Sequence, residues 1–347
     1  MPSTMRNTTT TPGARRLAAA AVSLGCLALA VPAGTADAAP ADPVPTVFFG
    51  DSYTADFGIA PYQEGDRLFC FQAKENYPAT AARRLADKSI TLDVQSDVSC
   101  GGALIRHFWE EQETLPGSGL KVPPQQEALK ADTQLVVGSM GGNTLGFTHI
   151  LKQCSDKLRA EEHNLLPGAP VDGDEPAGRC AEFFGSGDGK LWLDDRFEQV
   201  GWELEEMLDR MAYFSPDAKR VLVGYPRLVP EDTDKCLTPA PGQTELPLAD
   251  IPKDAMPVLD QIQKRLEEVM KKAVADAEGG ADFVDLYDQT GTNTACDGAD
   301  RGIGGLLENS QIGSDGQWLP WYAHPNDKGR DLQAQHVAAK TESVLNR

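Results

Sequence analysis

The sequence predicts an α/β protein, a three-layer α/β/α sandwich around a five-stranded parallel sheet. Short apolar runs that end in glycine or proline turns alternate with longer segments whose apolar residues recur at helical spacing. This alternation favours parallel strands joined by helical crossovers in a single domain. The expected strands are residues 47–49, 90–94, 135–138, 221–226 and 283–286.

Helices are expected between these strands. The apolar spacing predicts a helix around Tyr77, Ala81 and Leu85, and helical spacing resumes at 145–151. Further helices are expected over residues 190–214, 254–278 and 327–345, and irregular segments over 55–71 and 287–323, with loop insertions at 154–180 and 226–252.

Residues 1–38 have the layout of a cleaved signal peptide. Arginines precede the apolar run 17–31, and small residues at 36–38 suit a signal peptidase. The run is shorter than the roughly 20 residues that span a bilayer, which disfavours a membrane anchor. We therefore expect a secreted, extracellular protein comprising residues 39–347, with no stable membrane insertion.

Charge and composition narrow the possible partners. The formal net charge is −20, which disfavours nucleic acid and anionic membrane surfaces. The acidic residues Asp172, Asp174 and Glu175 could hold calcium, but they lack the spacing of a calcium loop, and a solvated loop is favoured. We expect a monomer with no metal and no cofactor.

The cysteine count agrees with export. Cys26 lies in the leader, which leaves an even number of cysteines, as expected for disulfides in an exported protein. Six cysteines allow 15 pairings. We favour the sequential one, Cys70–Cys100, Cys154–Cys180 and Cys236–Cys296. No pair of short Cys-x-x-Cys units is present, which disfavours a zinc site.

Residues suited to acyl transfer follow the ends of expected strands. Ser52 follows the first strand, Gly102 the second and Asn143 the third. Because the carboxyl ends of parallel strands meet at one edge of a sheet, these residues should lie close together. Acyl transfer needs a nucleophile, a base and donors for an oxyanion. Ser52 is the candidate nucleophile, and the alternative is that 50–52 is only a turn.

The base must be chosen from five histidines. His324 is preferred because Pro325 fixes the chain just after it and directs it into the last helix. His107, shortly after the second turn, is the rival. The remaining candidates are His149, His163 and His336.

Four blocks of residues, in order, resemble the GDSL or SGNH hydrolases, most closely secreted actinobacterial esterases, lipases and phospholipases A. They are Gly50-Asp51-Ser52, Gly102 near Cys100, Gly141-Gly142-Asn143 and His324-Pro325-Asn326. The resemblance spans essentially all of residues 39–347 and implies the flavodoxin-like SGNH hydrolase fold. It also implies that Ser52 is the nucleophile and His324 the general base and then acid. The oxyanion hole would comprise the Ser52 and Gly102 N–H groups and the Asn143 amide.

Two positions depart from the pattern of these hydrolases. Thr144 replaces a common aspartate, which should change only local hydrogen bonding. Trp321 stands three residues before His324, where an aspartate usually orients the base, and an indole can only donate a hydrogen bond. We therefore hypothesise a Ser52/His324 dyad in which the Trp321 backbone carbonyl orients the imidazole, as in some members of the family.

Aromatic residues near the proposed base suggest the substrate. Residues 318–322 and 108–109 could line an apolar acyl pocket, and the alternative is that some of them pack in the core. The sequence therefore predicts a serine esterase or lipase acting on small-molecule or lipid carboxylic esters. Alternatives are a carbohydrate acetyl esterase, which uses the same machinery, a calcium-dependent hydrolase, and a non-catalytic secreted binding protein on the same scaffold.

Overall fold

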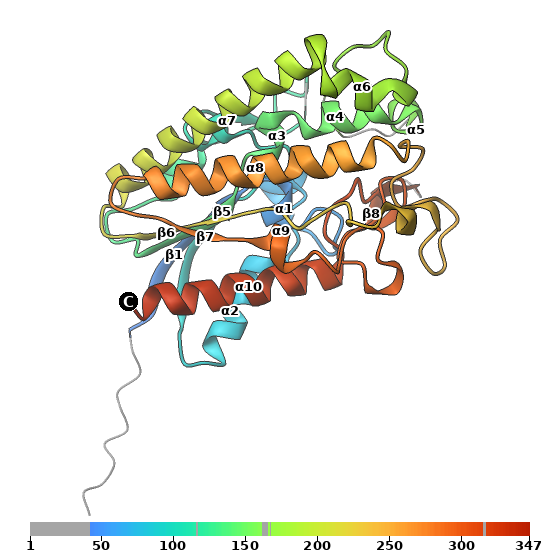
Figure 1. The fold of residues 1–347 in the computed structure, drawn as a ribbon. Coiled ribbons are helices and arrows are strands. Elements are labelled where there is room, and N and C mark those ends of the chain that lie inside the picture. The colour runs from blue at the N-terminus through green and yellow to red at the C-terminus, as the bar shows by residue number, and fades with distance from the viewer. Residues whose placement is uncertain (1–41, 116, 162–165, 167, 315–316) are drawn as a thin grey trace, which may run out of the picture. The chain divides into compact units, whose positions relative to one another are not determined.

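A five-stranded parallel sheet forms the centre of the computed structural model, which describes residues 42–115, 117–161, 166, 168–314 and 317–347 (Figure 1). The strand order is β2-β1-β5-β6-β7. The strands are β1 (Val44–Gly50), β2 (Leu92–Asp97), β5 (Leu135–Ser139), β6 (Lys219–Val223) and β7 (Asp282–Val284). The expected leader 1–38 and His163 lie outside the described residues.

Four long helices cover the two faces of the sheet: α2 (Tyr77–Ala86), α7 (Gly187–Phe214), α8 (Met256–Asp276) and α10 (Asp327–Leu345). Helices α7 and α8 lie on one face, and α2 and α10 on the other (Figure 1). The shorter helices are α1 (Ser52–Ala55), α3 (Gly142–Leu145), α4 (Phe147–Cys154), α5 (Asp156–Ala160), α6 (Cys180–Gly185) and α9 (Leu286–Gln289). The 3-10 turns are η1 (Gly65–Cys70), η2 (Ile105–Phe108), η3 (Gln125–Ala128), η4 (Ala177–Arg179), η5 (Thr233–Leu237) and η6 (Gly298–Asp300).

Alternating side chains of the central strands build the two cores. Val47 and Phe49 of β1 pack in the cluster that contains α7 and α8, whereas Phe48 packs with α2 and α10. Strand β5 repeats the pattern, with Val136 on the first face and Val137 on the second. Successive strand residues point to opposite faces, so a strand covered on both sides is apolar throughout. This arrangement confirms the predicted three-layer α/β/α sandwich.

The strands differ from their predicted bounds where a turn or cap intervenes. The predicted second strand began at Ile90, but the Ile90 N–H donates to Leu85 O and so closes the end of α2. The fifth ends at Val284 because the Asp285 side chain caps α9, accepting from Asp288 N at 3.1 Å. The hydrogen bonds at these two positions thus belong to helix ends, so β2 starts two residues later than predicted and extends to Asp97, and β7 ends two residues earlier than predicted.

Two segments expected to be loops contain regular structure. Residues 287–323 include the antiparallel hairpin β8 (Asn309–Ser314) and β9 (Gln317–Pro320). The 154–180 insertion contains α5 and η4 and ends at the first residue of α6. A second small hairpin pairs β3 (Gln112–Glu113) with β4 (Lys121–Val122). These elements are too short to give a clear period in the sequence.

Three disulfides join Cys70 to Cys100, Cys154 to Cys180 and Cys236 to Cys296, which is the sequential arrangement. Cys100 lies three residues after the end of β2, so the first disulfide ties η1 to the turn at the carboxyl edge of the sheet. Within the part of the chain that the structure describes, no helix is long and apolar enough to cross a membrane.

Candidate active site

The candidate site lies at the carboxyl edge of the sheet, beside β1. This strand pairs with β2 on one side and with β5 on the other, so the chain connections leave it in opposite directions. Ligands of open α/β sheets bind in the crevice that such a switch point creates. The turns that follow β1 and β5 carry Ser52 and Asn143, and both residues line the same cavity.

A tight turn presents Ser52 at the N-terminus of α1. Gly50 has φ of 147°, and a Cβ there would lie 2.1 Å from Thr54 Oγ1, so only glycine fits. The Gly50 peptide groups are paired with the buried Gln125 amide, whose Oε1 accepts from Gly50 N at 2.8 Å and whose Nε2 donates to Gly50 O at 2.9 Å. Asp51 caps the helix by accepting from Tyr53 N at 2.9 Å.

His324 contacts Ser52 directly. Its Nε2 lies 2.7 Å from Ser52 Oγ, and its Nδ1 lies 2.9 Å from the backbone oxygen of Trp321. A carbonyl can only accept, so Nδ1 carries the proton and Nε2 is free to accept from the serine hydroxyl. Burial lowers the pKa of His324 to about 4, and its hydrogen bond to Trp321 O opposes that shift. The imidazole is therefore neutral at neutral pH.

The chain before His324 has an unusual backbone. Tyr322 and Ala323 have φ of 49° and 62°, in the left-handed region that non-glycine residues rarely adopt. Two anchors hold this loop: Tyr53 Oη donates to Ala323 O at 2.7 Å, and the Asn326 side chain caps α10 through Gly329 N at 3.1 Å. The loop places the imidazole against the Ser52 hydroxyl, just before the last helix.

Three groups at or near Ser52 are suited to bind an oxyanion. The serine N–H lies at the N-terminus of α1, Gly102 lies in the turn after β2, and Asn143 belongs to α3 (Gly142–Leu145). Gly102 has φ of 72°, and Asn143 Nδ2 donates one proton to Ala103 O at 3.0 Å. This bond orients the Asn143 amide and leaves its second proton for another acceptor. All three residues line the cavity.

A buried hydrogen-bond chain joins the turns after β1 and β5. Gly142 N donates to Tyr225 Oη at 2.9 Å, and Tyr225 Oη donates to Asp51 Oδ2 at 2.6 Å. Burial raises the pKa of Asp51 to about 7, and the Tyr225 bond opposes that shift. No sequence pattern predicted a role for Tyr225 in the site, because this residue follows β6 and meets Asp51 only in the folded chain.

The cavity above Ser52 has a volume of about 410 Å³. One part of its wall is aromatic, from Phe57, Phe69, Phe71, Phe147 and Tyr322, and another part is polar, including Arg106, His107, Gln112, Thr114 and Arg196. The wall therefore suits an ester with an apolar part and a polar part.

Most of the aromatic residues expected to line the pocket lie elsewhere. Of 318–322 and 108–109, only Tyr322 lines the cavity. Trp318 is 57% exposed, whereas Phe108 is buried in the core. Trp321 is buried because its indole packs between Gly58 and Gly304, whose Cβ positions it would overlap. Three aromatic residues of the lining, Phe57, Phe69 and Phe71, come instead from the irregular segment 55–71, which has no sequence period.

Comparison with known proteins identifies the family. The model of the GDSL-like lipase/acylhydrolase family matches residues 48–332. The chain belongs to this family. It is 74% identical over 350 residues to an esterase of Streptomyces scabiei, with full coverage of both chains. It is also 30% identical to lipase 2 of Streptomyces coelicolor, over 94% of this chain and 97% of that one.

Solved structures agree on the fold. Phospholipase A1 from Streptomyces albidoflavus NA297 superposes with a TM-score of 0.56 at 19% identity, over 87% of this chain and 99% of that one. The extracellular lipase of Streptomyces rimosus gives the same TM-score at 20% identity, over 86% of this chain and 99% of that one. As a member of the GDSL-like family, the chain is a carboxylic ester hydrolase.

The other described histidines make no hydrogen bond to Ser52. His107 lines the cavity, but its Nδ1 accepts from Leu104 N at 3.0 Å, and burial lowers its pKa to about 4. His149 Nδ1 lies 2.7 Å from Ala169 O, and His336 lies within α10. Only His324, of the described histidines, is within hydrogen-bond distance of Ser52 Oγ.

Thr144 takes part in local hydrogen bonds, where many GDSL members have aspartate. Its Oγ1 accepts from Ile105 N at 2.8 Å and donates to Glu203 Oε2 at 3.4 Å. These bonds tie α3, which carries Asn143, to η2 and α7. Among the described residues, no group of three or more His, Cys, Asp or Glu side chains is arranged to hold a metal ion.

Proposed function

We propose that the protein is a secreted serine esterase that hydrolyses acyl or lipid esters through an acyl-enzyme on Ser52, with His324 as the base. The hydrogen bond of 2.7 Å between Ser52 Oγ and His324 Nε2 carries this proposal. The Trp321 carbonyl on Nδ1 supports it further, because it selects the tautomer that a general base needs.

The first half of the reaction forms the acyl-enzyme. Ser52 Oγ attacks the carbonyl carbon of the ester while its proton moves to His324 Nε2. The negative charge that develops on the carbonyl oxygen is stabilised by the N–H groups of Ser52 and Gly102 and by the Asn143 amide. The tetrahedral intermediate then collapses, and the bond to the leaving alcohol breaks as that alcohol takes the proton from His324.

The second half releases the acid. Water attacks the acyl carbon while His324 accepts its proton, and the same donors stabilise the second oxyanion. Collapse of this intermediate breaks the bond to Ser52 Oγ, which recovers its proton from His324. The imidazolium formed in each half faces the neutral Trp321 carbonyl, which holds its orientation and stabilises its charge less than a carboxylate would.

Several features support secretion and an acyl or lipid substrate. The leader pattern of residues 1–38 and the three disulfides suit an exported protein, and the similar Streptomyces rimosus lipase is named as extracellular. The aromatic wall of the cavity suits an acyl chain. Relatives named lipase and phospholipase A1 agree with such substrates.

A substrate panel on the wild type, Ser52→Ala and His324→Ala tests the proposal. The panel contains p-nitrophenyl esters from acetyl to palmitoyl, a phospholipid and acetylated xylan. We expect the highest kcat/KM with an acyl ester longer than acetyl, and loss of activity in both variants. Ester hydrolysis by Ser52→Ala at the wild-type rate would overturn the mechanism. A preference for acetylated xylan would instead favour the carbohydrate esterase.

A further inference from the structure

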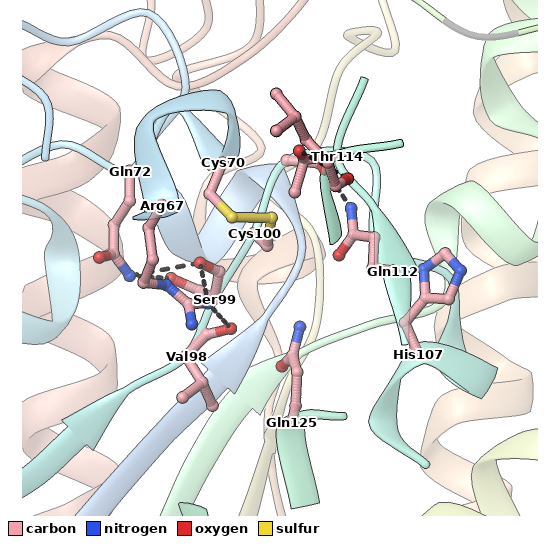
Figure 2. Close-up of a disulfide and its surroundings, with 12 residues drawn as sticks. Arg67, Cys70, Gln72, Val98, Ser99, Cys100, His107, Gln112, Thr114 and Gln125 are labelled. Carbon is pink, nitrogen blue, oxygen red and sulfur yellow. Dashed lines mark hydrogen bonds between the residues drawn. A yellow bond between two sulfur atoms is a disulfide. The ribbon is translucent and has the colours of Figure 1, made fainter. Parts of the chain in front are cut away.

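Gln112, the first residue of β3, is buried beside the turn that carries Gly102. It is 3% exposed, and its Nε2 donates to Gly101 O at 2.7 Å. A Cβ placed on Gly102 would have Gln112 Nε2 as its nearest neighbour, at 3.9 Å. Figure 2 shows the Gln112 amide between the Cys70–Cys100 disulfide and the His107 ring.

The carbonyl that Gln112 holds belongs to the same peptide unit as the Gly102 N–H. A peptide bond is planar and trans, so the C=O of Gly101 and the N–H of Gly102 point in opposite directions. Fixing the carbonyl therefore fixes the direction of the N–H. Both glycines line the cavity, on the wall that contains Ser52.

The preceding peptide unit is fixed from the other side. Gly101 N donates to Cys70 O at 2.9 Å, and Cys100 N donates to Gly50 O at 3.0 Å. Ala103 N donates to Cys100 O at 3.1 Å and closes a turn around the Gly101–Gly102 peptide, but turns of types I and II share this bond and differ in the direction of the central peptide. Glycine itself restricts the backbone little, so the bond from Gln112 to Gly101 O selects that direction. A donor on Gly101 O also polarises the peptide and strengthens its N–H as a donor.

The burial of Gln112 is not accounted for by stability alone. Its Oε1 is buried and has no hydrogen-bond partner in the described structure, which costs about 1–3 kcal/mol for such a group. The Gly101 carbonyl must accept from the amide nitrogen, so the amide cannot turn over to satisfy Oε1 without breaking the bond of 2.7 Å. Gln112 thus keeps its bond to the Gly101 carbonyl of the turn, although its own Oε1 then has no partner among the described residues.

We propose that Gln112 is a positioning residue for the oxyanion hole, which orients the Gly102 N–H by holding the carbonyl end of the Gly101–Gly102 peptide. This inference rests on the proposed function, in which that N–H stabilises the oxyanion. Gln112 does not touch the reacting atoms. It acts through the backbone of the turn.

The first test compares Gln112→Met with the wild type, because methionine keeps the length of the side chain and removes the donor. We expect kcat to fall by about 10- to 100-fold, with little change in KM. This loss is at most about as large as that from removing an oxyanion donor itself. Tm should change little, because the variant also removes a buried unpaired acceptor. A fall in Tm with kcat unchanged would overturn the proposal.

Transition-state analogues separate positioning from general loosening of the cavity. A trifluoromethyl ketone adds Ser52 Oγ to its carbonyl and leaves an oxyanion in the hole, whereas the matching methyl ketone binds without addition. In Gln112→Met the Ki of the trifluoromethyl ketone should rise in parallel with the loss of kcat/KM, and that of the methyl ketone should stay the same. Equal increases for both compounds would contradict the proposal.

A conservative variant adds a pH-dependent rescue. In Gln112→Glu, a protonated carboxyl can donate to Gly101 O, whereas a carboxylate repels it. The ratio of variant to wild-type kcat should therefore rise as the pH falls from 8 to 5, a range in which His324 stays neutral. A ratio that does not change over this range would count against an orienting hydrogen bond.

Two control variants complete the experiment. Gln153→Leu removes another buried glutamine whose amide bridges backbone groups, Asp172 N and Glu175 O, away from the cavity lining. Thr114→Val changes a polar cavity residue whose hydroxyl is bonded to Leu120 O. Neither should change the ratio of the two Ki values.

If the trifluoromethyl ketone formed no adduct with Ser52 in the wild type, the proposed function itself would fail, whereas an adduct unaffected by Gln112→Met would overturn only this inference.

Discussion

Tyr53 and Ala323 connect the segments of Ser52 and His324: the Tyr53 hydroxyl donates to the Ala323 carbonyl at 2.7 Å. Tyr53 directly follows Ser52, and Ala323 directly precedes His324. The Tyr53 ring also packs against the imidazole, with the ring centroids 4.9 Å apart. One side chain thus holds together the two segments that exchange a proton in the proposed mechanism.

Removing this hydroxyl should weaken catalysis more than stability. We expect Tyr53→Phe to lower kcat about tenfold, because the left-handed loop before His324 loses an anchor, and to lower the free energy of unfolding by about 1 kcal/mol. Stopped-time assays with a p-nitrophenyl ester and urea unfolding measure the two quantities. Unchanged kcat would show that the loop holds its position without Tyr53.

The Trp321 position tests the dyad without a carboxylate. Because the orienting group is a backbone carbonyl, Trp321→Phe should keep most of the wild-type kcat, while His324→Ala loses it. Trp321→Ala is a poorer test, since truncating the buried indole would cost about 3–5 kcal/mol of stability. A loss of kcat in folded Trp321→Phe as large as that of His324→Ala would contradict the role of the carbonyl.

The pH dependence of hydrolysis should reflect the burial of His324. Its pKa is lowered to about 4, so the neutral, proton-accepting imidazole predominates above that pH. We expect kcat/KM to fall on acidification with an apparent pKa near 4, measured by product analysis at fixed times. An apparent pKa at or above the ordinary histidine value of about 6.5 would contradict this.

His107 provides the control for that profile, since burial lowers its pKa to about 4 as well. In His107→Asn the side-chain oxygen can still accept from Leu104 N, and the acidic limb of the profile should persist. Disappearance of the limb would make His107 the titrating group.

Glu267 should make the stability depend on pH in the opposite direction from an ordinary salt-bridged carboxylate. It is 1% exposed, its Oε1 accepts from Tyr225 N at 2.7 Å, and burial raises its pKa to about 8. Between about pH 4.5 and 8 the folded state therefore binds more protons than the unfolded state, so stability falls as the pH rises.

Glu267→Gln removes this titration and keeps an acceptor for Tyr225 N. Relative to the wild type, its free energy of unfolding should increase between pH 5 and pH 8 by a few kcal/mol, at about 1.4 kcal/mol per pKa unit. Urea unfolding at both pH values measures the change, with the exposed Glu198→Gln as the control. An equal difference from the wild type at both pH values would refute it.

Much of the fold and of the candidate site could be predicted because strand, turn and helix follow one another in the sequence. The apolar run before Gly50 and the one before Met140 both ended in turns, and parallel strands bring such turns to one edge. The contact between Ser52 and His324 spans most of the chain, and its prediction drew on the residue types, their order and the resemblance to the GDSL or SGNH hydrolases.

Some residues of the site could not be predicted from the sequence, because their contacts leave no periodic pattern in it. Tyr225, Gln112 and Gln125 meet the site from the ends of unrelated elements, and each is visible only as a hydrogen bond in the folded chain. The aromatic lining was misplaced for a similar reason: segment 55–71 has no helical or strand pattern, whereas the tryptophans near His324 were conspicuous but are exposed or packed between glycines.

The cavity wall and the sheet are made by different parts of the chain. Phe57, Phe69 and Phe71 of the aromatic wall come from the segment after α1, and none of them belongs to a strand. Acyl-chain preference can therefore be altered by substituting this segment while the sheet and the dyad stay as they are. The same separation lets one hydrolytic centre be adapted to many esters, which makes residues 57–71 the natural target for a directed-evolution library.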